Sequence, residues 1–333
     1  MPRRRRRIES LKCYEICFRA RDTLPLVARK IIEMIVQHAL ARSQRDEKLY
    51  LCHDVWNGSH PHLLVLTKDA EQCKRFYTEV QKKITDCLKR LFGLDYLCIW
   101  EGRPTVALIA DVDEAINRIS YLYANPAQDN LETSIERFPG ISSWSDFLQI
   151  IEEPNLSVSV SQEVLRLRLP NFPKFQSFSP SFAQEQGGIR LLKRRNSETQ
   201  FLIRHPNMWM RAFGIRETGV PGINRLIVKK LRRREELANW LRKLSGKSVL
   251  GSMKLKSQPI LKPHKPKKKE RKVFYFGSCN EARKQFLGEF EEFCLECANC
   301  FKEWLSGNLL VQWPPGAFKP PLPPNMNIIE FLY

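Results

Sequence analysis

The sequence has no long apolar run. No window approaches the roughly 18 consecutive apolar residues that a membrane-spanning helix needs, so we expect no membrane segment. The arginines at positions 3–7 are followed by Ile8-Glu9-Ser10-Leu11-Lys12 and not by an apolar core, which argues against a secretory signal. We therefore expect a cytoplasmic protein.

Acidic residues are scarce relative to basic ones. The 333 residues include 55 lysines and arginines against 36 acidic residues, a formal net charge of +19. An excess of this size favours a polyanionic partner, because lysine and arginine displace the counterions condensed on nucleic acid. An anionic membrane surface fits less well, since no segment is basic on one face and aromatic on the other. We expect a nucleoid-associated protein.

A disulfide framework is also not expected, although the chain has ten cysteines. A chain of this length, 43% hydrophobic, can bury sizeable cores without cross-links, so we expect reduced thiols. Cys294, Cys297 and Cys300 are spaced by three within a predicted helix, and Cys279 is the only nearby thiol that could serve as a fourth zinc ligand. Steps of about 300° spread such thiols around a helix, so core packing is the default and zinc the alternative.

Two short motifs carry the candidate chemistry. His60-Pro61-His62 places two histidines on a predicted strand, where residues i and i+2 point to the same face. Tyr121 and Asn125 are four residues apart on a predicted helix and therefore share a face. Two imidazoles, an amide oxygen and a phenol around a divalent cation suit attack by tyrosine on a phosphodiester. The alternative is a purely structural histidine pair.

These residues define the predicted site. The candidate nucleophile is Tyr121, and the candidate metal ligands are His60, His62 and Asn125. Mg²⁺ or Mn²⁺ suits a mixed imidazole and amide site with open water positions.

Tyr123 is the rival nucleophile. It lies about 200° round the helix from Tyr121, so the two cannot both face one cation. Tyr121 is favoured because Asn125 supplies a ligand four residues on, where Tyr123 would have Ala127. We expect Tyr123 to pack in the core, and His53 to be structural or to support the metal ligands.

Periodicity in the first 150 residues predicts an α+β fold, an antiparallel sheet covered by helices. We expect strands over 11–20, 48–56, 60–67, 95–100 and 105–110, with a hairpin at Asn57-Gly58. We expect helices over 23–41, 69–91 and 111–126, the first with Pro25 in its opening turn, the last capped by Asp111 and ended by Pro126.

Roughly residues 8–150 resemble a known family. The matching features are Tyr14-Glu15-Ile16-Cys17-Phe18-Arg19-Ala20, the His60-Pro61-His62 pair, Trp100-Glu101-Gly102-Arg103, Tyr121-Leu122-Tyr123-Ala124-Asn125-Pro126 and Phe138-Pro139-Gly140-Ile141-Ser142-Ser143-Trp144. They resemble the single-tyrosine HUH transposases, and especially the REP-associated tyrosine transposases of bacteria. Two positions depart from the family: Pro61 replaces a bulky hydrophobic residue, and Ser59 stands where asparagine is usual.

The resemblance implies a ferredoxin-like HUH endonuclease domain that cuts and rejoins single-stranded DNA near a hairpin. Tyr121 would form a 5′-phosphotyrosine link and leave a free 3′-OH, which can later attack that link. Because proline cannot donate to a sheet ladder, Pro61 keeps a second interpretation open, a decayed or domesticated relative that binds DNA without cutting it. An RNA-binding protein is the third interpretation, since RNA is also recognised as single strands and hairpins.

The remainder of the chain divides by composition. Residues 151–189 are expected to be a loop-rich connector, and residues 190–333 a basic, mostly helical DNA-binding region with a proline-rich tail. From Arg190 to Lys272 there are 25 lysines and arginines against five acidic residues, a net charge of +20. Either a monomer or a homodimer is compatible with the sequence. The expected DNA contacts are Arg3, Arg4, Arg5, Arg6, Arg7, Lys193, Arg194, Arg195, Lys229, Lys230, Arg232, Arg233 and Arg234.

Large apolar residues of the basic region have two interpretations. Met208, Trp209, Met210 and Phe213 lie among arginines and would either stack on bases or pack in a core. A helix over 280–306 is expected to bury Phe286, Phe290, Phe293 and Phe301.

Overall fold

The structure is a computed structural model that describes residues 7–21, 23–24, 28–58, 60–152, 155–168, 172–263 and 273–320. The strands are β1 (Lys12–Cys17), β2 (Thr23–Leu24), β3 (Tyr50–Val55), β4 (His62–Thr67), β5 (Thr105–Ile109), β6 (Val160–Leu165), β7 (Thr199–Arg204), β8 (Lys262–Pro263) and β9 (Tyr275–Phe276). The α-helices are α1 (Lys30–Glu47), α2 (Ala70–Phe92), α3 (Val112–Gln128), α4 (Trp144–Gln149), α5 (Phe182–Arg195), α6 (Val220–Leu244), α7 (Ser252–Lys256) and α8 (Asn280–Leu305).

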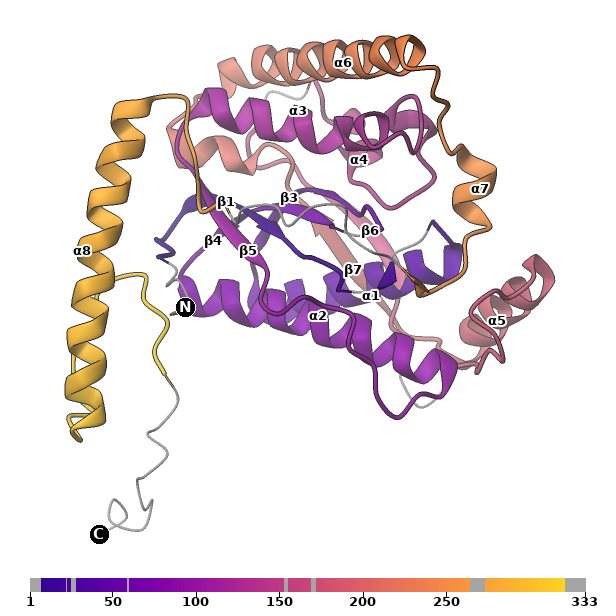
Figure 1. Ribbon diagram of the computed structural model, residues 1–333, viewed down its shortest axis with the longest axis horizontal. Coiled ribbons are helices and arrows are strands. Elements are labelled where there is room, and N and C mark those ends of the chain that lie inside the picture. Colours follow the sequence, from indigo (N-terminus) through magenta and orange to yellow (C-terminus); the bar gives the residue numbers. More distant parts are fainter. Residues whose placement is uncertain are drawn as a thin grey trace.

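A five-stranded sheet in the order β3-β4-β1-β5-β9 forms the centre of this α+β fold. Neighbouring strands are antiparallel, except β5 and β9, which are parallel. Helices α1 and α2 cover one face, and α3 and α4 cover the other, with α6 outside α3 (Figure 1). Along β4, Leu63 and Val65 enter the core beside α1 and α2, whereas Leu64 and Leu66 enter the core beside α3.

The helices begin and end where local chemistry dictates. Asp69 accepts a hydrogen bond from the backbone of Gln72 and caps α2, which ends at Gly93 with φ of 65°. Asp111 caps α3 in the same way. Residues on one side of α2 are buried at helical spacing, as expected from the sequence.

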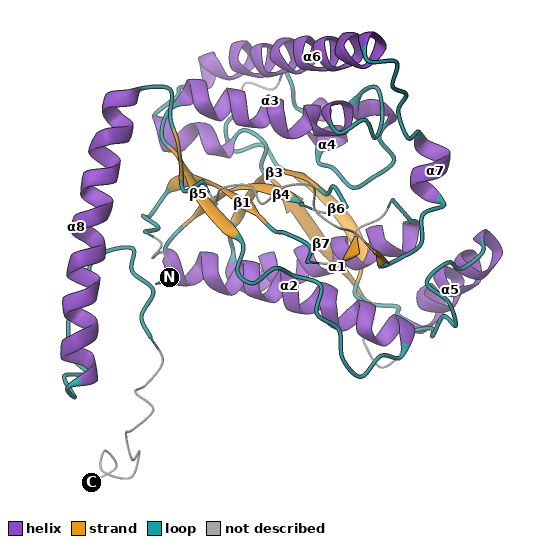
Figure 2. Cartoon of the chain, viewed as in Figure 1, coloured by secondary structure: helices purple, strands orange, loops and turns teal. Residues whose placement is uncertain are grey.

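Segments after residue 150 complete the same two cores. The antiparallel β6–β7 pair packs on α1, and Leu202 and Leu192 join the core on that side. Helix α6 packs along α3, and Ile227 and Leu231 join the other core. Helix α8 stands at the side of the molecule (Figure 2). Over the described ranges, no helix is long and apolar enough to cross a membrane.

Three expectations within the first 150 residues are corrected. Helix α1 begins at Lys30, because residues 23–24 pair with β8, and it runs beyond residue 41 to Glu47, where Lys48 adopts the left-handed conformation with φ of 50°. Residues 95–100 are not a strand, since β1 and β9 occupy both edges of β5 and only Trp100 forms a bridge. Pro126 lies inside α3, which continues to Gln128.

Further differences concern the later segments. The expected loop-rich stretch contains β6 and the first half of α5. Trp209 is fully buried in the core beside α3, so it packs and does not present a face to bases. On α8, Phe293 is buried as expected, but Phe301 is 38% exposed. Cys297 is buried, while Cys294 and Cys300 are partly exposed.

Candidate functional site

The rings of Tyr121 and His62 meet on the α3 side of the sheet. Their centroids lie 6.3 Å apart and the ring planes are nearly perpendicular, at 86°. The ring of His60 lies 5.3 Å from that of His62, centroid to centroid. The structure thus brings both histidines and the predicted nucleophile together.

Strand register explains this meeting. His62 pairs with Cys17 of β1, and Leu64 pairs with Glu15, so His62 and Glu15 are diagonal neighbours on one face. Cys13 and Leu64 on this face belong to the core beside α3, which crosses above it. Pro61 is accommodated because it precedes β4 and contributes only its carbonyl, which accepts from the backbone of Phe18 at 3.1 Å.

Glu15 connects His62 to the helix that carries Tyr121. His62 Nδ1 donates to Glu15 Oε1 at 2.6 Å. Arg118 donates from Nε to Oε2 at 2.7 Å and from Nη2 to Oε1 at 2.8 Å, a bidentate pair. Glu15 is only 4% exposed, so its charge is compensated by two cationic groups and not by water.

The pKa values of this cluster follow from its contacts. Burial alone would raise the pKa of Glu15, but His62 and Arg118 outweigh it and lower that pKa to about 2. Burial alone would lower the pKa of His62, but Cys17 and Glu15 outweigh it and raise that pKa to about 10. The same salt bridge raises the pKa of Arg118 despite burial.

Arg118 also lies against the predicted nucleophile. Its guanidinium carbon is 4.4 Å from the ring centre of Tyr121 and 4.1 Å from that of Phe276 on β9. Two rings and one carboxylate therefore fix the guanidinium, a typical arginine environment.

The predicted metal ligands differ in their surroundings. His62 Nε2 and Asn125 Nδ2 are both buried and neither has a hydrogen-bond partner; Asn125 as a residue is 2% exposed. His60 Nε2 lies 3.8 Å from Asp129 at the end of α3. Within the described residues, no cluster of three or more His, Cys, Asp or Glu could hold a metal ion. A cation here would therefore use the two imidazoles and the amide oxygen of Asn125. Of the two orphaned atoms, Nε2 of His62 fits that role, whereas Nδ2 of Asn125 is a hydrogen-bond donor and does not bind a cation.

Basic residues of α6 approach the same part of α3. Lys230 Nζ donates to Asn117 at 2.7 Å, and Arg234 Nε donates to Ser120 at 3.3 Å. Arg232 is instead paired with Glu136 and Glu235 on the far side of the helix.

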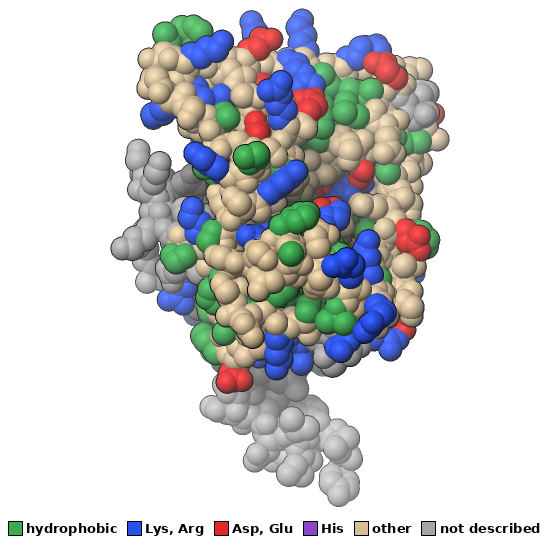
Figure 3. All heavy atoms as spheres, turned by 90° about the vertical axis from the view of Figure 1, so that its right-hand side faces the viewer, with side chains coloured by type: hydrophobic (Ala, Val, Ile, Leu, Met, Phe, Trp, Pro, Cys, Tyr) green, Lys and Arg blue, Asp and Glu red, His purple; other side chains and the backbone are tan. Residues whose placement is uncertain are grey.

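The other predicted DNA contacts are dispersed. Lys229 and Arg233 are exposed on α6. Arg7 pairs with Glu9 at 2.9 Å and with Glu289, and residues 3–6 lie outside the described residues. The exposed Lys193, Arg194 and Arg195 end α5, on the α1 side of the sheet. Figure 3 views the molecule from the side where α5 and α7 lie in Figure 1, and shows basic side chains spread over this face with hydrophobic ones between them.

Tyr123 is fully buried and packs as expected from the sequence. Its hydroxyl lies 2.8 Å from His53 Nδ1 and 2.8 Å from Ser143 Oγ. Burial lowers the pKa of His53 to about 3, so this imidazole is neutral. Tyr123 and His53 therefore belong to a structural network.

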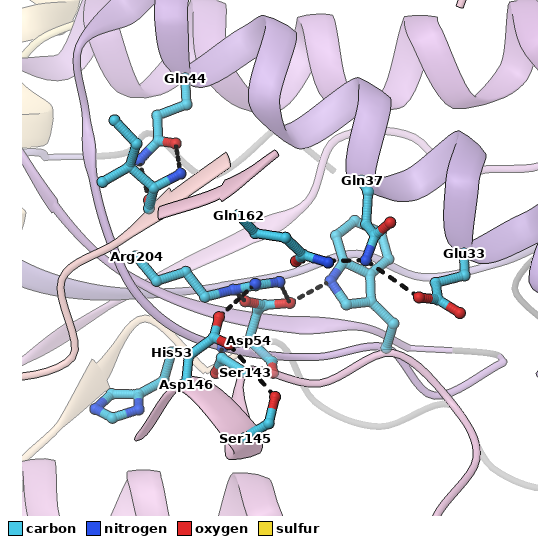
Figure 4. A network of polar contacts seen from close by, with 12 residues as sticks. Glu33, Gln37, Gln44, His53, Asp54, Ser143, Ser145, Asp146, Gln162 and Arg204 are labelled. Carbon is cyan, nitrogen blue, oxygen red and sulfur yellow. Dashed lines mark hydrogen bonds and ion pairs between the residues drawn. The ribbon is translucent and has the colours of Figure 1, made fainter. Parts of the chain in front are cut away.

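A buried ion cluster adjoins that network (Figure 4). Arg204 of β7 donates from Nε to Asp54 at 2.7 Å and from Nη1 to Asp146 at 2.7 Å. Trp56 also donates to Asp54, at 2.9 Å. The cluster links β3, α4 and β7, the last of these from the segment after residue 150.

Sequence reasoning missed Glu15, Arg118 and Phe276. A signal existed for Glu15, because a carboxylate between Tyr14 and Ile16 in a central strand needs a buried partner. Arg118, three residues before Tyr121, carried no comparable signal.

No family model matches the chain, and no curated protein matches it. Among solved structures, the chain is similar to a REP-associated tyrosine transposase bound to a REP hairpin, with 18% identity and a TM-score of 0.38. The similarity covers 45% of this chain and 86% of that one.

Proposed function

We propose that the protein is a transposase that nicks and rejoins single-stranded or hairpin DNA through Tyr121. The observation that carries the proposal is the packing of the Tyr121 ring beside the His62 ring, with Arg118 against its face. The β-α-β-β-α-β order of β1, α1, β3, β4, α2 and β5, with strand order β3-β4-β1-β5, supports a ferredoxin-like HUH unit.

In this proposal Tyr121 attacks a phosphodiester, forming a 5′-phosphotyrosine link and releasing a 3′-OH. His60, His62 and Asn125 would hold Mg²⁺ or Mn²⁺, which when bound polarises the phosphate and neutralises developing charge. Glu15 holds Nδ1 of His62, so a cation would bind at Nε2 and would displace the proton that the raised pKa of His62 keeps on the imidazole. Lys230 and Arg234 place positive charge on the DNA side of α3.

The test is covalent capture of DNA. The full chain is incubated with a pool of single-stranded and hairpin oligonucleotides plus Mn²⁺, followed by a denaturing gel and peptide mapping. We expect an adduct on the peptide containing Tyr121, absent in Tyr121→Phe and retained in Tyr96→Phe, a control at a tyrosine that is 80% exposed. An adduct that persists in Tyr121→Phe would contradict the proposal.

A second candidate is a DNA- or RNA-binding protein of the same fold that does not cut. The observation favouring it is that His60 lies before β4 and its Nε2 is 3.8 Å from Asp129 Oδ2, a contact that competes with metal ligation. Hairpin binding with no adduct in Mg²⁺ or Mn²⁺ would support this candidate, and competition between matched DNA and RNA hairpins would identify the nucleic acid.

A further inference from the structure

The environment of Arg118 differs from that of a solvated surface arginine. Its side chain is 17% exposed, and two of its nitrogens are committed to Glu15. Its guanidinium carbon is about equally close to the rings of Tyr121 and Phe276. These contacts restrict the rotamers of a side chain that is otherwise flexible, so its charge has a fixed position.

That fixed position is at the face of the candidate nucleophile. Arg118 precedes Tyr121 by three residues on α3, so the two side chains are neighbours on one face of the helix. Glu15 uses Nε and Nη2, which leaves Nη1 as the nitrogen that Glu15 does not engage. A guanidinium held at two nitrogens can still donate from the third to a phosphate oxygen.

We infer that Arg118 binds the scissile phosphate of the DNA, and that Glu15 is a positioning residue that fixes Arg118 and His62 together. This inference rests on the proposed function. In the step concerned, the bond between Tyr121 Oη and phosphorus forms and the bond between phosphorus and O3′ breaks. The phenol proton passes to solvent water, and O3′ takes a proton from water. Arg118 keeps its proton and donates to a non-bridging oxygen, where negative charge develops.

The alternative is that Arg118 is purely structural. Its loss would then weaken the binding of every oligonucleotide equally, through the fold or through the net charge. A phosphate-binding Arg118 is coupled specifically to the charge of one phosphate. A methylphosphonate at that position removes the charge and leaves the rest of the oligonucleotide unchanged.

The experiment is a thermodynamic cycle on the full chain. The cut position is first mapped from the wild-type adduct. Binding is then measured by fluorescence anisotropy in the Tyr121→Phe background, without added metal, using the native oligonucleotide and the same oligonucleotide with a methylphosphonate at that position. Arg118→Gln and Arg118→Lys are compared with Arg75→Gln on α2, which removes the contact from the exposed Arg75 Nε to the two carboxylate oxygens of Glu47 on α1.

We expect Arg118→Gln to weaken binding of the native oligonucleotide about 10-fold or more, and to have little effect with the methylphosphonate. Arg118→Lys should keep part of the affinity, because it keeps the charge. Arg75→Gln should affect both oligonucleotides equally and slightly.

Equal losses on both oligonucleotides for Arg118→Gln and full affinity for Arg118→Lys would overturn the inference while leaving the proposed function intact. Absence of any wild-type adduct overturns the proposed function, and the inference with it. Thermal melting of each variant identifies a loss of affinity that is due to unfolding. If Arg118→Gln is unfolded, the binding of Arg118→Lys to the two oligonucleotides decides whether Arg118 binds the phosphate.

Discussion

Arg234 on α6 lies over the ring of Tyr121 on α3, with its guanidinium carbon 6.0 Å from the ring centre. The two residues are far apart in the sequence and meet because α6 packs along α3. In the described part of the chain, the basic segment from Arg190 to Lys272 is therefore not a separate domain. Its helix α6 lies beside the candidate nucleophile, where its positive charge can act on bound nucleic acid.

Basic residues of α6 should divide into two groups. Lys229→Gln combined with Arg233→Gln removes two exposed charges and should flatten the salt dependence of single-stranded DNA binding by about two contacts, roughly 0.7 in slope per contact. The free energy of unfolding of this double variant should be unchanged.

Arg232→Gln should instead lower the free energy of unfolding by about 1 kcal/mol, since it leaves the buried Glu235 without its ion pair. Binding titrations over a salt series measure the slope, and urea unfolding measures the stability. An unchanged slope in the double variant would mean that Lys229 and Arg233 do not contact phosphate.

Tyr123→Phe should affect stability and not chemistry. It removes a buried hydroxyl that contacts His53 Nδ1 and Ser143 Oγ, so we expect a loss of about 1–3 kcal/mol in the free energy of unfolding. The DNA adduct should still form, because Tyr123 lies in the core and Tyr121 does not. Urea unfolding and the denaturing-gel assay are the measurements. Loss of the adduct in a folded Tyr123→Phe variant would reassign the nucleophile.

Local signals predicted much of the fold near the site. The helices capped by Asp69 and Asp111 begin where capping places them, and the strand predicted over 60–67 forms over His62–Thr67, so that His60 and Pro61 precede it. These elements depend on interactions within a few residues. Tyr123 was also correctly placed in the core by its angular separation from Tyr121.

Long-range packing accounts for what the sequence did not predict. Residues 95–100 have a strand-like composition, but β9, from a segment far along the chain, occupies the edge of β5. Phe276 reaches Arg118 by that pairing, and periodicity contains no information about it. The arginines around Trp209 do not distinguish stacking on bases from packing in a core; it packs because η3 (Met208–Phe213) lies against β1 and β4.

Acid should destabilise the protein through His38. Burial, with Lys83 and Arg166 nearby, lowers the pKa of His38 to about 4, and its Nδ1 accepts from the backbone of Leu167 at 3.1 Å. The unfolded chain, with a histidine pKa of about 6.5, binds the proton first. The contribution is therefore complete above about pH 6.5 and is lost as the pH falls towards 4, by at most about 3 kcal/mol. Urea unfolding from pH 7 to 4 should show a shallower pH dependence in His38→Gln than in wild type; parallel curves would contradict this assignment.

Removing Arg204 should be among the most damaging single changes. Asp54 is fully buried and Asp146 nearly so, and Arg204 is the cation that both contact. Arg204→Met leaves two carboxylates in a low-dielectric environment, and we expect a loss of about 3–5 kcal/mol in the free energy of unfolding. Arg166→Met is the matched control, because its pair with Glu198 is exposed and should cost at most about 1 kcal/mol. Adding Asp54→Asn and Asp146→Asn to Arg204→Met should recover part of the loss, since the cost arises from uncompensated charge and not from lost packing. Chemical denaturation of the four proteins distinguishes these causes: no recovery in the triple variant would show that Arg204 stabilises the fold through its hydrogen-bond geometry and packing alone.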